Sequence, residues 1–150
     1  MPETLDGIPV HPLVVHAVVV LIPLAALGVI AVALVPKWRA RFGVVVMGLA
    51  LLALVFVPVA KESGEQLQER LGETDLIEKH AELGDQALLG AGPLAVVAVV
   101  LWWMGRRAQQ DRPLPTWVGW LVPLVSILVA LGAMAQVFLI GHSGAKAVWG

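Results

Sequence analysis

The sequence predicts an all-α membrane protein, a four-transmembrane-helix bundle whose second and third helices extend into an outer helical hairpin. Hydrophobic residues make up 59% of the 150 positions and charged residues only 14%, whereas about half of a soluble domain is apolar. Four uncharged apolar segments are each long enough to cross about 30 Å of hydrocarbon. Short basic loops join the first segment to the second and the third to the fourth, whereas nearly all the acidic residues lie at the start of the chain and between the second and third segments.

The first predicted span covers residues 13–35. It follows an acidic start that lacks the basic region of a signal peptide, so we expect it to be retained as a helix. The remaining spans are 43–60, 86–104 and 117–140, all within one domain, 1–150. Each span contains one proline, which membrane helices tolerate as a bend. These prolines are Pro23, Pro58, Pro93 and Pro123.

Basic residues predict the orientation of the bundle. The loops 36–42 and 105–115 carry Lys37, Arg39, Arg41, Arg106, Arg107 and Arg112. By the positive-inside rule these loops are cytoplasmic, and both termini then face outward. Tryptophans are enriched at membrane interfaces, and Trp38, Trp102, Trp103, Trp117 and Trp120 all fall at the proposed inner one.

Residues 61–85 form the outer hairpin. The segment is charged but rich in helix formers, which favours helix over linker. Gly72 is suited to end the second helix and Thr74 to cap the third, so the helices should end near Leu71 and begin near Asp75.

One polar residue is predicted to pack within the bundle. Gln136 is the strongly polar side chain that lies deepest in a span, and we expect it to bond a neighbouring helix.

All four histidines fall on the outer side of the predicted topology. His11 and His16 lie at the start of the first helix, His80 on the outer hairpin and His142 near the end of the fourth helix. A four-helix bundle can bring such distant stretches together. His16 is the most informative, because an ionisable side chain inside the membrane boundary is costly and points to a site.

Imidazoles arranged in this way have three chemical uses. A pair can ligate the iron of haem b in a bundle, which needs no covalent motif. With Glu62 or Glu65 they would supply the mixed nitrogen and oxygen ligands of a zinc, iron or copper ion. They could also sense pH or relay protons. The simplest alternative is that each imidazole sits at the interface with its polar tip in water.

Other classes of function are excluded. Without cysteine the chain cannot form a disulfide, a thiolate nucleophile, an iron–sulfur cluster or a covalent c-type haem. A net charge of −1 without a basic stripe argues against a nucleic-acid partner. There is no hydrolase or transferase motif, because Ser63 and Ser143 lie in glycine-flanked runs (ESGE and HSGA) without a nucleophile elbow. A redox role is the enzymatic option that remains.

Several motifs carry a family resemblance over nearly the whole chain. They are GIPVHPLVVHAVVVLIPL at the start, ESGEQLQERL and EKHAELG in the middle, and GHSGAKAVW at the end. Together they resemble a bacterial membrane family, domain of unknown function 2231 (DUF2231). The pattern carries over onto His11, Pro12, His16, Glu62, Glu65, His80, Gly141, His142 and Gly144. Ala17 and Val18 depart from it, since the family tends to have phenylalanine and proline there. The resemblance implies a bacterial cytoplasmic membrane and, because relatives resemble modules beside respiratory electron-transfer domains, a redox setting.

We therefore predict an outward-facing site that binds haem b for electron transfer. His16, His80 and His142 are the expected ligands, His11 would lie beside the propionates, and Glu65 would orient His80.

Two alternatives to haem are open. A non-haem metal-binding or metal-sensing protein would use Glu62 and Glu65 as further ligands, and a structural accessory subunit of a membrane complex would need no cofactor. The expected partners are the lipid bilayer, a respiratory electron-transfer protein or quinone, and a second copy of the chain.

Overall fold

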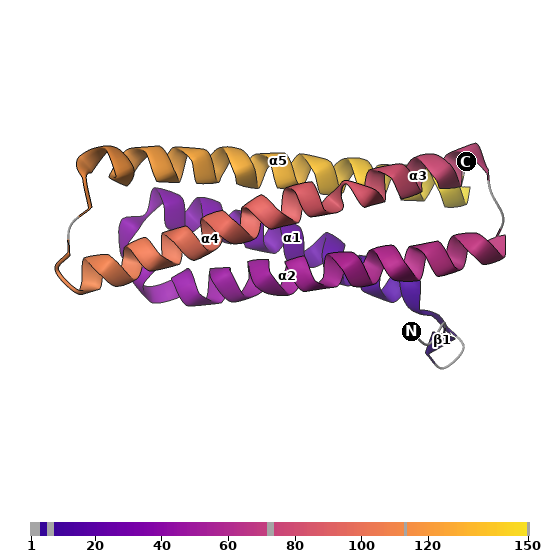
Figure 1. Ribbon diagram of the computed structural model, residues 1–150, viewed down its shortest axis with the longest axis horizontal. Helices are drawn as coiled ribbons and strands as arrows, with labels where there is room; N and C mark the ends of the chain where they lie inside the picture. The colour runs from indigo at the N-terminus through magenta and orange to yellow at the C-terminus, as the bar shows by residue number, and fades with distance from the viewer. Residues whose placement is uncertain (1–3, 6–7, 72–73, 113, 150) are drawn as a thin grey trace.

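The fold is an elongated helical bundle. The computed structural model describes all residues except 1–3, 6–7, 72–73, 113 and 150. In the described part the helices are α1 (Val10–Leu34), α2 (Pro36–Leu71), α3 (Asp75–Asp85), α4 (Ala87–Gln109) and α5 (Thr116–Trp149) (Figure 1). Ahead of α1, β1 (Thr4–Leu5) pairs antiparallel with β2 (Ile8–Pro9). Among the described residues four helical segments, α3 being continued by α4, are long and apolar enough to cross a membrane, which confirms the predicted fold class.

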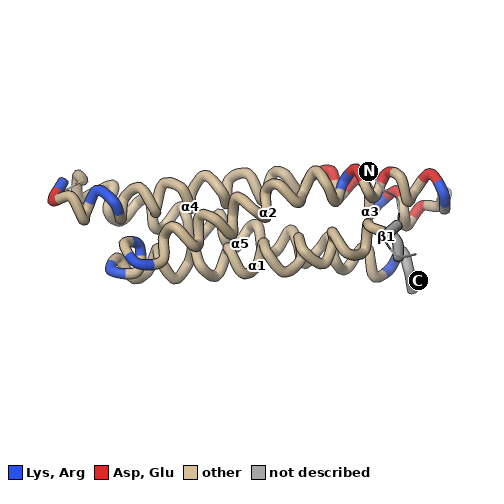
Figure 2. The backbone as a smooth tube through the Cα atoms, turned by 90° about the horizontal axis from the view of Figure 1, so that it is seen from below, with Lys and Arg blue, Asp and Glu red and all other residues tan. Residues whose placement is uncertain are grey.

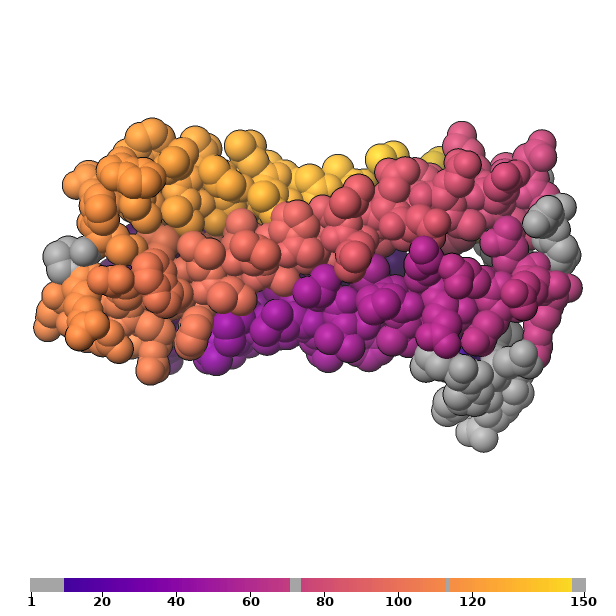
Figure 3. All heavy atoms as spheres, viewed as in Figure 1, coloured from indigo at the N-terminus to yellow at the C-terminus, as the bar shows by residue number. Residues whose placement is uncertain are grey.

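The four long helices pack as a ring. α1 contacts α2, α2 contacts α4, α4 contacts α5, and α5 closes the ring on α1, while α1 and α4 also touch across the centre. In Figure 3 the side chains of α4 lie against those of α2 along the visible face. Residues at helical spacing fill the interior, such as Ile22, Ala25, Ala26 and Val29 of α1.

The outside of the bundle is also apolar. Phe138 is 73% exposed and Leu128 is 61% exposed, and many other large aliphatic side chains point outward with them. Contiguous apolar surface of this extent is unfavourable in water but suits the hydrocarbon of a bilayer.

Charged residues gather at the two ends. Figure 2 shows the basic residues of the α1–α2 and α4–α5 connections at one end, and most acidic residues on α2 and α3 at the other. The predicted pairing of the two basic loops on one side of the bundle is therefore seen in the fold.

Arg39 covers the end of α1. Its Nε donates to the carbonyl of Val32 at 2.8 Å and its terminal nitrogen to the carbonyl of Ala33 at 2.7 Å, and the side chain is buried. These carbonyls belong to the last turn of α1, which ends just before Pro36 and has no helical partners for them. The buried guanidinium supplies the missing donors.

At the other end α2 and α3 extend beyond the predicted spans. The predicted helix boundaries are confirmed, since α2 runs to Leu71, α3 starts at Asp75 and the Thr74 hydroxyl accepts a hydrogen bond from the amide of Ile77 at 3.3 Å. Gly72, the predicted helix end signal, lies outside the described residues. α3 packs more extensively against α5 than against α2 but contacts both helices, and Lys61 of α2 pairs with Asp85 of α3, so the predicted hairpin is present and leans on α5.

The junction between α3 and α4 is held by the fifth helix. Gln136 Nε2 donates to the carbonyl of Gln86 at 2.5 Å, which confirms that this amide bonds a neighbouring part of the bundle. α5 itself continues to Trp149, past the predicted end of the span at residue 140.

Candidate functional site

α2 holds His11 at the end of the bundle that lies away from the two basic loops. Its Nδ1 lies 3.2 Å from the carbonyl oxygen of Ala60 and 3.2 Å from Oγ of Ser63. The Ser63 hydroxyl is buried and donates to the Ala60 carbonyl at 2.9 Å. The short connection between α1 and α2 makes the two helices antiparallel neighbours, which places the start of α1 beside the outer half of α2.

His80 is held in the same way by α5. Its Nδ1 lies 2.9 Å from Oγ of Ser143, whose hydroxyl donates to the Ile140 carbonyl at 2.8 Å. Burial lowers the pKa of this imidazole, on the charged outer helix α3, and a hydrogen bond with the Ile140 backbone opposes the shift. The surroundings of His80 therefore favour the neutral, ligand-competent form.

His11 and His80 lie at the same end of the bundle. α1 carries His11 at its start and contacts α5, the helix against which α3 holds His80. Neither Nε2 has a hydrogen-bond partner among the described residues. In the part of the chain that the structure describes, two imidazoles anchored at Nδ1 and without a partner at Nε2 thus share this end of the bundle.

His16 and His142 are placed differently. Both are exposed, and their direct contacts are with their own helices: His16 Nδ1 donates to the carbonyl of Pro12 at 2.6 Å, and the His142 ring stacks on Phe138 at 6.3 Å between centroids. His142 also lines an apolar groove between α1 and α5. The hydrogen bonds therefore connect His80 to α5 through Ser143 and not through the neighbouring His142.

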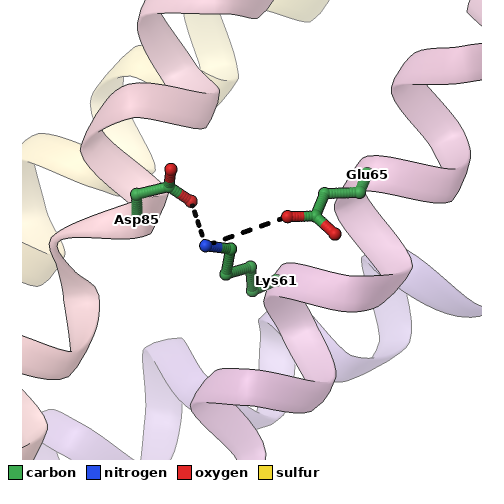
Figure 4. A network of polar contacts seen from close by, with 3 residues as sticks. All are labelled: Lys61, Glu65 and Asp85. Atoms are coloured by element: carbon green, nitrogen blue, oxygen red, sulfur yellow. Dashed lines mark ion pairs between the residues drawn. The ribbon is translucent and has the colours of Figure 1, made fainter.

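The carboxylates also differ from expectation. Glu65 does not orient His80, whose Nδ1 bonds Ser143 instead. Lys61 Nζ lies 3.8 Å from Glu65 and 3.0 Å from Asp85, as Figure 4 shows, so Glu65 belongs to an exposed ion-pair network between α2 and the end of α3. The physical reason is the packing of α3 on α5, which leaves His80 facing that helix.

A mononuclear metal site would need more ligands. Over the residues that the structure describes, no group of three or more His, Asp or Glu side chains lies close enough to hold a metal ion. Glu62 is exposed on α2, one residue before the serine that binds His11.

Ser63 and Ser143 have a role that the sequence pattern did not predict. Neither lies in a nucleophile elbow, yet each anchors an imidazole. They share a signal in the sequence, since each precedes a glycine and each lies three residues past the end of a predicted span.

Comparison with known families agrees with this architecture. A family model described as "Predicted membrane protein (DUF2231)" matches residues 7–150, which include every histidine and both serines. No curated protein and no solved structure gives a match. The match covers almost the entire chain, so this four-helix membrane protein belongs to the DUF2231 family.

Proposed function

We propose that the protein binds haem b at the outer end of the bundle through His11 and His80 and passes electrons through it. The observation that supports this is the pair of imidazoles at one end of the bundle, each anchored at Nδ1 with Nε2 left for a ligand. Ligating imidazoles in proteins usually donate their second nitrogen to an oxygen acceptor in the same way.

The number of ligands favours haem over a bare ion. Zinc and most transition-metal sites take three or more protein ligands, whereas iron in a porphyrin already has four nitrogens and needs only two axial ones. A pair of histidines without a third His, Asp or Glu among the described residues suits the second case. This pair replaces the ligand set His16, His80 and His142 expected from the sequence.

The site would face away from the cytoplasm. The basic loops lie at the opposite end of the bundle from α3 and the start of α1, which carry His80 and His11, and such loops stay on the cytoplasmic side. In a bacterial cytoplasmic membrane both termini and the haem would then lie outside, where a respiratory protein or a quinone could exchange electrons with it.

The visible spectrum of the detergent-purified protein, produced with haem supplied, tests the proposal. We expect a Soret band and, after dithionite, sharp α and β bands in the native protein. His11→Ala and His80→Ala should each lose the bound haem, while His16→Ala and His142→Ala, on exposed positions, should retain it. A native protein without haem would overturn the function, and haem loss confined to the His16 or His142 variants would overturn the ligand pair.

A further inference from the structure

The surroundings of His11 and His80 are copies of each other. The chain forms two helical hairpins, the first from α1 and α2 and the second from α3, α4 and α5. In both, Nδ1 of the histidine meets the hydroxyl of a serine on the returning helix, at 3.2 Å for Ser63 and 2.9 Å for Ser143. In both, that hydroxyl donates to the carbonyl three residues earlier.

A glycine completes each copy. A Cβ atom on Gly64 would lie 3.0 Å from Cε1 of His11, and one on Gly144 would lie 3.0 Å from Cε1 of His80. That spacing is tighter than an ordinary van der Waals contact, so each glycine makes room for the edge of the imidazole beside it.

The repetition continues into the membrane. Counted from the histidine, the same positions are buried in α1 and in α4: Ile22, Ala25, Ala26, Val29 and Val32 correspond to Ala91, Leu94, Ala95, Ala98 and Leu101. Counted from the serine, buried Ala50, Ala53 and Val57 of α2 correspond to the identical residues Ala130, Ala133 and Val137 of α5.

The helix contacts obey the same exchange. In the two hairpins α1 corresponds to α4, and α2 corresponds to α5. The contact of α1 with α2 therefore corresponds to that of α4 with α5, and both are present. Likewise the contact of α2 with α4 corresponds to that of α5 with α1, and both are present. The bundle thus has an approximate two-fold axis along its length, and the diagonal pair α1 and α4 lies across it.

The hydrogen bonds also determine where the imidazole protons are. A carbonyl only accepts, so the contact of His11 Nδ1 with the Ala60 carbonyl requires a proton on Nδ1. The hydroxyls of Ser63 and Ser143 each donate their single proton to a helix carbonyl. Toward the imidazole each hydroxyl oxygen can therefore only accept a hydrogen bond, from Nδ1–H. In the neutral rings the lone pair is therefore on Nε2.

We infer that the chain is a tandem duplication of one helical hairpin, and that Ser63 and Ser143 are equivalent positioning residues. They hold His11 and His80 as Nδ1–H tautomers so that both Nε2 lone pairs are presented to one ligand at the two-fold axis. The chemical class of ligand is a metal centre that accepts two imidazole nitrogens. The tautomers belong to the cofactor-free protein, so this inference is tested separately from the binding of haem.

The experiment is nitrogen NMR of haem-free protein labelled with ¹⁵N-histidine, at a pH where the imidazoles are neutral. His11→Gln and His80→Gln assign the two resonances. In the native protein we expect both rings as Nδ1–H tautomers. Ser63→Ala should raise the Nε2–H fraction of His11 only, and Ser143→Ala that of His80 only, because each ring then loses one acceptor.

Ser126→Ala is the matched control. Ser126 is a buried serine of α5 whose hydroxyl bonds only its own helix, at the Val122 carbonyl, so its removal should leave every tautomer unchanged. An Nε2–H tautomer at either His11 or His80 in the native protein, or serine variants that move neither ring, would overturn the inference. The native spectrum alone decides the first point, whether or not the variants fold.

Discussion

At the scale of single residues, a buried polar side chain forms hydrogen bonds with backbone carbonyls that have no partner within their own helix. Arg39 is the clearest case, because its guanidinium donates to two carbonyls of the last turn of α1. Hydrogen bonds from a charged donor contribute about 1.5–3 kcal/mol, and an unpaired buried carbonyl is costly in itself. In the hydrocarbon-facing part of a protein no water replaces the lost donor.

Arg39→Ala should therefore destabilise the protein by about 2 kcal/mol or more, measured as the free energy of unfolding in mixed micelles. Arg41→Ala is the matched control, since Arg41 lies in the same connection and carries the same charge, but is exposed and, among the described residues, lies over the Phe42 ring without capping a helix. Equal stability losses in the two variants would show that the charge of the connection matters and not the capping of α1.

At the scale of helices, the junction of α3 and α4 depends on one close contact with α5. Gln136 reaches the carbonyl of Gln86 over Gly90, and a Cβ atom on Gly90 would collide with Oε1 of Gln136. Gly90→Ala should push the flexible Gln136 amide aside and break this hydrogen bond, a loss of about 0.5–1.5 kcal/mol that offsets the better helix propensity of alanine. Thermal unfolding in detergent measures the loss.

The control for this prediction lies one half-turn away on the same helix. Gly92 has open space where a Cβ would be, so Gly92→Ala should be neutral or stabilising. If both variants lowered the melting temperature equally, the contact with Gln136 would not be the cause.

Helix positions could be predicted from the sequence to a greater extent than helix neighbours. Uncharged length and loop charge predicted four spans, and the capping chemistry of Thr74 predicted where α3 begins, because these signals are local. Which helix α3 packs against is a long-range property. The expected partner of His80 was Glu65 on α2, whereas the fold turns this ring toward Ser143 of α5, 63 residues further along the chain.

For the candidate site too, local signals could be predicted from the sequence and long-range packing could not. Composition and topology placed all the histidines at one end, but helical phase decides which of them point inward. His11 and His80 face the interior, while His16, expected to be a ligand, is exposed one turn further along α1. The inferred duplication is also difficult to recognise in the sequence alone. The equivalent buried positions of α1 and α4 are mostly occupied by different residues.

At the scale of the whole molecule, function depends on which side of the membrane carries the histidines. The chain has no cysteine, so single introduced cysteines report the topology without background. Thr74, between α2 and α3, and Gln110, at the end of α4, are both exposed and lie at opposite ends of the bundle. By the charge of the loops, position 74 should be outside and position 110 inside.

In intact bacteria a membrane-impermeant maleimide should therefore label Thr74→Cys and leave Gln110→Cys unmodified, and both should react once the cells are lysed. The reverse pattern would put His11 and His80 on the cytoplasmic side and remove any exchange of electrons with an external partner, although the pairing of the imidazoles would be unaffected. Labelling of both positions in intact cells would mean that the helices between them do not cross the bilayer. Loop charge would then no longer indicate an outward-facing site, because one end of a bundle faces outward only if its helices span the membrane.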